Sequence, residues 1–388
     1  MKQLPGTEDI LLSVLDIVED KHSNIWIGTW LNGLIKYNLK TSTFKHYRYD
    51  SKVQNSKNWV FNDLEIQQVG EKEIIWATTS GPFLLMFDTE TELLTQEALA
   101  PYFPEHPKII ATSHLLLDSH DALWITTSYG ILRLDPLKQL FKTFRLEPQK
   151  PLEYYSSVTT LYQDTYDKTG NTIWLAVPTW GLCKFNMQSQ KVIWFNNFVT
   201  QNKSTLTVNK ILRKDEDEIW LATYSGLIKF NTITQSYSIY TNNKNDSLSL
   251  SSNYISDLEY DLEGRLWVST YFNGVNIYNA DNDCFKRLKT DKLKLLPNVN
   301  LSQNINDMAI DKNGNIWLAR GYELGRKAGI SVINAKSLEE TFYYQSASNP
   351  DFPFQEEIYS LFPDSKGSIW MGIPSVLPLL IRQKGWNI

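Results

Sequence analysis

The chain of 388 residues is short of the residue types that build most catalytic and redox sites. It has two cysteines, Cys183 and Cys284, which lie far apart in the sequence, and five histidines that do not group. A paired-cysteine motif, a histidine pair at helical spacing and a glycine-rich phosphate loop are all missing. We therefore expect no metal site and no cofactor, and the cysteines say little about the redox compartment.

Long apolar runs and clusters of positive charge are also missing. No segment approaches the roughly 18 apolar residues of a membrane span, and the first residues contain no apolar signal core. As written, the chain would stay in the cytoplasm, unless it is a piece of a longer exported protein. The net charge is −5 without a basic cluster, so nucleic acid is not an expected partner.

Aromatic residues are abundant, and eight tryptophans recur in one local pattern at spacings of 46 to 53 residues. Each lies in a short apolar run, usually after a turn of the Asp-x-x-Gly type and before a Gly that opens a second apolar run. The eight are Trp26, Trp76, Trp124, Trp174, Trp220, Trp267, Trp317 and Trp370. Repeats of this length, built from β-branched and aromatic residues, are typical of propeller blades.

The sixth repeat shows the expected unit most clearly. Strands are predicted over 254–260, 265–270, 275–279 and 284–288, from alternation and turn residues. Four strands in fewer than about fifty residues leave no room for a helix. The sequence therefore predicts an all-β fold, a β-propeller of four-stranded antiparallel blades that occupies residues 1–388 as a single domain. The repeated Trp is expected in the core, because both faces of every blade must be covered by neighbours.

The sequence leaves two possibilities for the number of blades. Eight Trp units favour eight blades, and the alternative is seven blades plus a stray unit. The last unit is irregular, since it lacks the Gly before its third strand and contains Pro374 and Pro378. Proline cannot donate to an interior ladder, so this unit suits an edge or closure position.

One segment carries the repeat almost in full: Asn24-Ile-Trp-Ile-Gly-Thr29 followed by Gly33-Leu-Ile-Lys-Tyr-Asn38. With Asp246-Ser-Leu-Ser249 before a first strand, it resembles the two-component regulator propeller repeat, over about Leu12 to Ile381. Such repeats form periplasmic sensor regions of hybrid two-component systems in Bacteroidetes, which typically report on polysaccharide breakdown products. Those regions usually have about twice as many repeats and are followed by an immunoglobulin-like domain, a membrane helix and a kinase, none of which is present here.

The resemblance implies a non-catalytic, periplasmic sensing propeller or a fragment of one. It implies an oligosaccharide as the ligand, and it allows a homodimer formed through the parent sensor. Two alternatives stay open: a polysaccharide hydrolase or lyase, and a protein-interaction scaffold. An enzyme would need an asymmetric pair of carboxylates or histidines on the loop face, where Glu323 is the acid that stands out.

The loops between second and third strands carry aromatic residues that strand packing does not explain. We predict that these loops form a binding rim, with nearby polar groups orienting a sugar. The predicted contacts are Trp30, Asn32, Tyr129, Trp180, Tyr224, Tyr271, Phe272, Asn273, Arg320 and Tyr322. The alternative is that each aromatic covers only its own blade. The seventh loop is the longest: 12 residues separate Trp317 from Gly329, against 5 to 7 in the first six repeats.

Acidic residues also recur on the first strands. Asp16, Asp257 and Asp307 each precede their Trp by ten residues, and His114 has the same place in the third repeat. A ring of carboxylates could bind a cation or act as acid and base. We favour a structural role, in which each Asp accepts backbone hydrogen bonds from the next blade, because a repeated residue does the same work in every unit.

Overall fold

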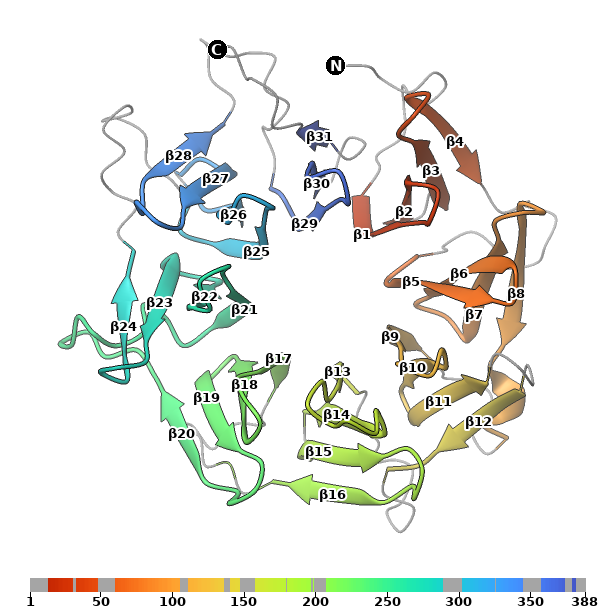
Figure 1. The fold of residues 1–388 in the computed structure, drawn as a ribbon, viewed down its shortest axis with the longest axis horizontal. Coiled ribbons are helices and arrows are strands. Elements are labelled where there is room, and N and C mark those ends of the chain that lie inside the picture. The colour runs from red at the N-terminus through yellow and green to blue at the C-terminus, as the bar shows by residue number, and fades with distance from the viewer. Residues whose placement is uncertain are drawn as a thin grey trace. The chain divides into compact units, whose positions relative to one another are not determined.

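The computed structural model describes residues 13–30, 33–47, 60–104, 111–135, 140–146, 158–178, 180–196, 198, 207–288, 302–324, 326–344, 357–373 and 379–381. Each Trp repeat forms one antiparallel sheet whose strands follow one another in chain order (Figure 1). We number these sheets blades 1 to 7 along the chain and call the last one the eighth sheet.

Blades 1 to 4 come from the first half of the chain. Blade 1 consists of β1 (Ser13–Glu19), β2 (Asn24–Trp30), β3 (Leu34–Asn38) and β4 (Thr43–Tyr47). Blade 2 consists of β5 (Leu64–Val69), β6 (Lys72–Thr78), β7 (Phe83–Asp88) and β8 (Leu93–Ala98). A 3-10 turn, η2 (Ala100–Tyr102), follows it. Blade 3 consists of β9 (Thr112–Leu117), β10 (Leu123–Thr127), β11 (Gly130–Asp135) and β12 (Leu140–Phe144). Blade 4 consists of β13 (Thr160–Gln163), β14 (Thr172–Val177), β15 (Gly181–Asn186) and β16 (Val192–Phe195).

The second half repeats the same order. Blade 5 consists of β17 (Val208–Arg213), β18 (Glu218–Thr223), β19 (Gly226–Asn231) and β20 (Tyr237–Tyr240). Blade 6 consists of β21 (Ile255–Tyr260), β22 (Leu266–Thr270), β23 (Val275–Asn279) and β24 (Cys284–Arg287). Blade 7 consists of β25 (Ile305–Ile310), β26 (Asn315–Arg320), β27 (Gly329–Asn334) and β28 (Glu340–Tyr343). The eighth sheet consists of β29 (Ser360–Pro363), β30 (Ile369–Gly372) and β31 (Leu379–Ile381).

The predicted all-β propeller of four-stranded antiparallel blades is confirmed. Within the described ranges, seven sheets have four strands and the eighth has three. The seven complete blades agree with the alternative count of seven, and the irregular last repeat forms the short sheet. Pro374 and Pro378 lie outside the described residues. The strands of the sixth repeat match the sequence expectation to within one residue at each end.

The chain divides into two compact units. The first contains the described residues within Met1–Val14, Leu221–Lys229 and Ser238–Ile388, and the second those within Leu15–Trp220 and Phe230–Tyr237. Blade 5 contributes to both. In the described part of the chain, no helix is long and apolar enough to cross a membrane.

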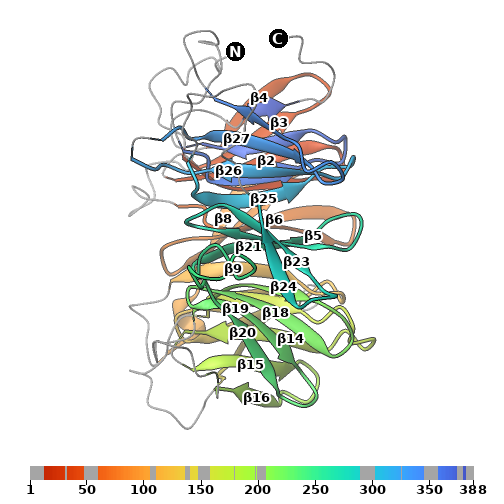
Figure 2. The ribbon, with the colours of Figure 1, turned by 90° about the vertical axis from the view of Figure 1, so that its left-hand side faces the viewer.

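The cores lie between neighbouring blades of a unit. In the second unit, Trp124 of blade 3 packs with Ile173 and Phe185 of blade 4. In the first unit, Trp267 of blade 6 packs with Met308 and Ile316 of blade 7. Figure 2 shows β26 and β27 side by side within blade 7, where their residues pair in antiparallel register. The repeated Trp is therefore a core residue, as predicted, and it is buried in all eight repeats.

The Asp of the turn motif has a second role that the sequence did not reveal. Oδ1 of Asp118 accepts the backbone N–H of His120 and of Ala122, which is the turn role, while Oδ2 accepts the indole N–H of Trp124 at 2.7 Å. The same indole–carboxylate bond joins Trp26 to Asp20, Trp174 to Asp164, Trp267 to Asp261, Trp317 to Asp311 and Trp370 to Asp364. One carboxylate thus fixes the hairpin and satisfies the buried indole.

Candidate binding surface

Four aromatic side chains of the first unit form a continuous patch at the loops of blades 5 and 6. The ring of Tyr224 lies 5.8 Å from that of Tyr271 and 6.2 Å from that of Tyr254, and Tyr254 lies 5.4 Å from Phe272. Tyr224, Tyr254 and Phe272 are 43%, 48% and 49% exposed. Contiguous apolar side chains that stay exposed to solvent are a feature of interaction sites. We call these four residues the aromatic patch.

Backbone hydrogen bonds hold the patch in place. The start of β19 is tied to the segment before β21, because Gly226 N–H donates to Asn253 O at 2.8 Å. The same segment is tied to the loop after β22, since Tyr271 N–H donates to Tyr254 O at 2.9 Å. Asn273 has a positive φ of 77°, and its Nδ2 donates to Ser251 O at 3.2 Å. The rings are therefore presented on fixed loops, which lowers the entropy lost on binding.

The electrostatic surroundings of the patch are negative. Burial, the neighbouring Tyr224 and the carboxylates of Asp257 and Asp307 together raise the pKa of the Tyr271 hydroxyl to about 12. The hydroxyl therefore stays protonated near neutral pH and keeps a hydrogen to donate. A carboxylate field of this sign favours neutral or hydroxyl-rich ligands over anionic ones.

The remaining predicted aromatics behave differently from one another. Trp30 ends β2 and is half exposed. Tyr129 packs against Phe103, with ring centroids 6.1 Å apart, and Trp180 packs against Trp194 at 5.6 Å. Tyr129 is half-buried against the core between blades 2 and 3, and Trp180 against the core between blades 3 and 4. Trp180 thus covers its own blade, as in the alternative, because Trp194 belongs to β16. Tyr322 of the first unit is well exposed.

The prediction that Arg320 contacts a ligand is corrected by its position. Its side chain ends β26 and is 0% exposed. Its Nη2 pairs with Glu340 Oε1 at 2.7 Å, while Nε donates to Ser331 Oγ and Nη1 to Ser302 O, both at 2.5 Å. Because the buried guanidinium is bonded to Glu340, Ser331 and Ser302, it cannot contact a ligand.

Two other polar residues at the predicted rim also have structural partners. The amide of Asn273 is used to fix its loop, and Asn32 lies outside the described residues. Glu323, the acid that stood out, accepts Gln303 N–H at 2.7 Å and pairs with Arg326 Nε at 3.0 Å. These contacts anchor the long seventh loop and leave Glu323 poorly suited to general acid–base work.

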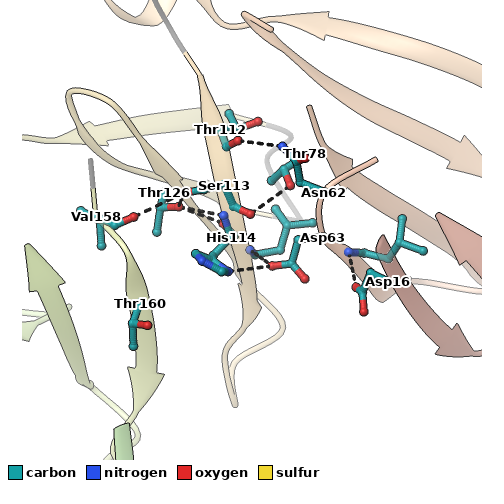
Figure 3. Close-up of polar contacts among 12 residues, drawn as sticks. Asp16, Asn62, Asp63, Thr78, Thr112, Ser113, His114, Thr126, Val158 and Thr160 are labelled. Atoms are coloured by element: carbon teal, nitrogen blue, oxygen red, sulfur yellow. Dashed lines mark hydrogen bonds and ion pairs between the residues drawn. The ribbon is translucent and has the colours of Figure 1, made fainter. Parts of the chain in front are cut away.

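Acidic residues of the first strands link successive blades. Asp16 Oδ2 accepts Leu64 N–H at 2.7 Å, and Asp63 Oδ2 accepts Leu115 N–H at 2.6 Å (Figure 3). In the first unit, Asp307 Oδ2 accepts Leu361 N–H at 2.7 Å. The favoured structural role is thus confirmed for Asp16 and Asp307. Asp257 has the equivalent position on β21, two residues before the residue that pairs with Trp267, and it is buried.

In the third repeat His114 takes the place of the first-strand carboxylate. It faces Asp63, the carboxylate of the second repeat. Its Nδ1 lies 3.6 Å from Asp63 Oδ2, so the two form an ion pair whenever the imidazole is protonated (Figure 3). Its own backbone N–H donates to Thr126 Oγ1 at 2.8 Å. Sequence reasoning missed Asp63, because this Asp precedes Trp76 by 13 residues instead of ten. Aligning the repeats by strand pairing, with Glu65 opposite Trp76, would have found it.

Burial and the neighbouring Asp63 raise the pKa of two carboxyl groups near the first strands. Burial raises the pKa of Asp16 well above its usual range, and the neighbouring Asp63 adds to the effect. Burial also raises the pKa of Glu65 to about 7, again with a contribution from Asp63. The two carboxyl groups therefore take up protons on folding.

This uptake predicts a pH dependence of stability. A carboxyl whose folded pKa is raised binds more protons in the native state, so its stabilising contribution is present below about pH 4.5 and is lost as the pH rises through 7. We expect Glu65→Gln to flatten the decline in the free energy of unfolding between pH 5 and pH 8, measured by urea denaturation. Glu71→Gln, in the turn of the same hairpin, should leave the wild-type slope unchanged. An identical slope in Glu65→Gln would contradict this account.

Tyr254 is the second residue that sequence reasoning missed as a site residue. It lies directly before β21, outside the loops between second and third strands, yet its ring completes the patch. Neither its position nor its type distinguishes it in the sequence. Among the described residues, no cluster of histidine, cysteine or acidic side chains is arranged to hold a metal ion.

Comparison with known proteins finds a histidine kinase by sequence, and extracellular domains and a propeller by structure. No family model matches the chain. Histidine kinase P4 of Formosa agariphila is 24% identical over 338 residues, which cover 85% of this chain and 23% of the kinase. The chain thus spans less than a quarter of that relative's length.

Two solved structures illustrate the structural neighbours. The extracellular domain of the hybrid two component system BT4673 from B. thetaiotaomicron is 17% identical, with a TM-score of 0.39 over 96% of this chain and 55% of that one. The Dos1 propeller is 12% identical, with a TM-score of 0.65 over 94% of this chain and 90% of that one. The latter agrees with the propeller fold. The chain is therefore a β-propeller, and over 85% of its length it is similar to part of a histidine kinase.

Proposed function

We propose that this chain is a non-catalytic sensing propeller whose aromatic patch binds a neutral oligosaccharide in the periplasm. The observation that carries the proposal is the contact among Tyr224, Tyr254, Tyr271 and Phe272 on fixed loops. Exposed rings offer flat apolar surfaces to the C–H faces of sugars, while tyrosine hydroxyls offer hydrogen bonds. The periplasmic location rests on the extracellular domains among the structural neighbours.

The choice of a neutral sugar follows from the charges at the patch. The cation expected at this rim, Arg320, is buried in an ion pair with Glu340. The charges that reach the patch are negative, because the carboxylates of Asp257 and Asp307 contribute to the raised pKa of Tyr271. An acidic sugar would meet repulsion without a compensating guanidinium.

The alternative of a polysaccharide hydrolase or lyase has less support. Glu323 is bound to Arg326 and to the backbone of Gln303. Asp16 and Asp63 each accept a backbone N–H from the next blade. Turnover of a glycan that disappears in Glu323→Gln would nevertheless overturn the non-catalytic assignment.

A glycan array followed by calorimetry on the best neutral binder tests the proposal. We expect Tyr224→Ala and Phe272→Ala each to weaken binding several-fold, because one stacked ring contributes on the order of 1 kcal/mol. The double variant should lose tenfold or more. Leu262→Ala, an exposed apolar residue on the first hairpin of blade 6, is the matched control and should bind as the wild type does. Unchanged affinity in the double variant would place the site elsewhere.

A further inference from the structure

Blades 1, 3 and 4 of the second unit cover the core Trp with a cation from the third strand. The residue directly opposite the Trp in the ladder is Lys36 for Trp26, Arg133 for Trp124 and Lys184 for Trp174. These cations lie 4.9, 5.8 and 5.6 Å from the respective ring centroids. Through this cation–π contact, the Lys or Arg side chain covers one face of each indole.

Two aromatic rings complete the cover in the same blades. One comes from the fourth strand, and it is Tyr47 beside Trp26, Phe144 beside Trp124 and Phe195 beside Trp174, at 5.5 to 5.7 Å. The other comes from the third strand of the next blade, and it is Phe87, Phe185 and Phe230 in turn, at 5.0 to 6.4 Å. The core Trp of these three blades is consequently 0% exposed.

Blade 2 departs from the pattern at all three positions. Met86, not a cation, lies opposite Trp76. Glu97 lies opposite Leu84, as the aromatic Tyr47 lies opposite Leu34 in blade 1. The next blade contributes Leu134 where the others contribute a Phe. Trp76 keeps a partner for its indole N–H, but that partner is Gln67, at 2.8 Å.

The three replacements leave a pocket of about 340 Å³ over Trp76, between blades 2 and 3. Its volume lies at the lower end of the range for small-molecule sites. Ile74, Met86, Leu134 and Phe141 form its apolar wall together with the ring of Tyr102. Trp76 is 6% exposed as a result.

The polar part of the lining consists mainly of acceptors and negative charge. Lys72 Nζ lies 3.3 Å from Asp88 Oδ2, so these two charges offset each other. Glu97 has no cationic partner among the described residues, and it accepts a hydrogen bond from the Tyr102 hydroxyl at 2.8 Å. Gln96 Oε1 is buried without a hydrogen-bond partner in the described part of the chain. The pocket thus has one carboxylate in excess and an unused acceptor.

We propose that this pocket binds a small organic cation that carries an apolar ring. The cation takes the place over Trp76 that a Lys or Arg side chain fills in the neighbouring blades, with Glu97 as its counter-charge. The ring fills the space that the fourth-strand aromatic fills elsewhere. This site lies in the second unit and shares no residue with the aromatic patch, so the two proposals stand or fall separately.

Calorimetry with benzyltrimethylammonium tests the site on the full chain, with benzyl alcohol and benzenesulfonate as neutral and anionic probes. We expect saturable binding of the cation and at least about tenfold weaker binding of both other probes. Binding of benzenesulfonate as strong as that of the cation would overturn the proposal, as would the absence of saturable cation binding.

Two variants rebuild the pattern of the other blades and should abolish the site without unfolding the blade. Met86→Lys supplies the missing cation and Glu97→Tyr the missing aromatic, so each should reduce affinity for benzyltrimethylammonium at least about tenfold. Leu93→Lys adds the same charge as Met86→Lys to an exposed residue of β8 that does not line the pocket, and it should bind as the wild type does. Thermal unfolding checks that each variant folds. Undiminished binding in both folded pocket variants would sink the proposal.

Discussion

Trp124→Ala is expected to lower the free energy of unfolding by about 3–5 kcal/mol, because it removes a large buried aromatic and leaves a cavity. Trp124 is 0% exposed and packs against Phe144 and Phe185 at ring distances of 5.5 and 5.7 Å. The substitution also leaves Asp118 Oδ2 without the indole N–H that it accepts at 2.7 Å. Urea denaturation at neutral pH measures the loss.

Two further variants separate packing from hydrogen bonding at this position. Trp124→Phe keeps most of the apolar contact and removes the indole donor, so it should cost about 1–3 kcal/mol, the penalty for an unsatisfied buried acceptor. Trp30→Ala removes the half-exposed Trp that ends β2 and should change stability by less than about 0.5 kcal/mol. Equal losses for Trp124→Ala and Trp30→Ala would contradict the assignment of the repeated Trp to the core.

Arg320→Ala is expected to cost about 3–5 kcal/mol of stability, as the breaking of a buried ion pair does. The side chain pairs with Glu340 at 2.7 Å and donates to Ser302 O and Ser331 Oγ. Its removal leaves the Glu340 carboxylate, with a side chain 11% exposed, without its counter-charge. Thermal and urea unfolding of the variant and the wild type provide the measurement.

A double variant distinguishes the ion pair from simple loss of volume. Arg320→Met combined with Glu340→Leu replaces both charges by apolar groups and should recover most of the stability, since such replacements are often neutral or stabilising. If Arg320→Ala were as stable as the wild type and bound acidic sugars less tightly, Arg320 would be a ligand contact after all. The buried position argues for loss of stability, with affinity unchanged in the folded fraction.

The binding rim illustrates how far loop residues can be assigned from a sequence. Tyr224, Tyr271 and Phe272 were predicted from their loops, and the structure brings them together. Tyr254 joins them only because Tyr271 N–H bonds to Tyr254 O and so sets the two segments beside each other. Such a contact depends on how neighbouring blades pack, which no local pattern records.

The sequence by itself determined the fold of this protein. A Trp every 46 to 53 residues, flanked by alternating runs and turn residues, can bury its apolar faces only by stacking four-stranded sheets. The role of the first-strand Asp was also assigned correctly for Asp16 and Asp307, because a residue that recurs at one strand position meets a need of that position.

Only the tertiary structure decided which side chains are left for binding. In the sequence Arg320 cannot be distinguished from a surface cation. In the structure it is buried and forms an ion pair with Glu340, 20 residues later. The pocket over Trp76 arises because Met86, Glu97 and Leu134, from three different strands, fail to cover one indole together. Burial is a property of neighbours in space, so these outcomes become visible only when the blades are packed against each other.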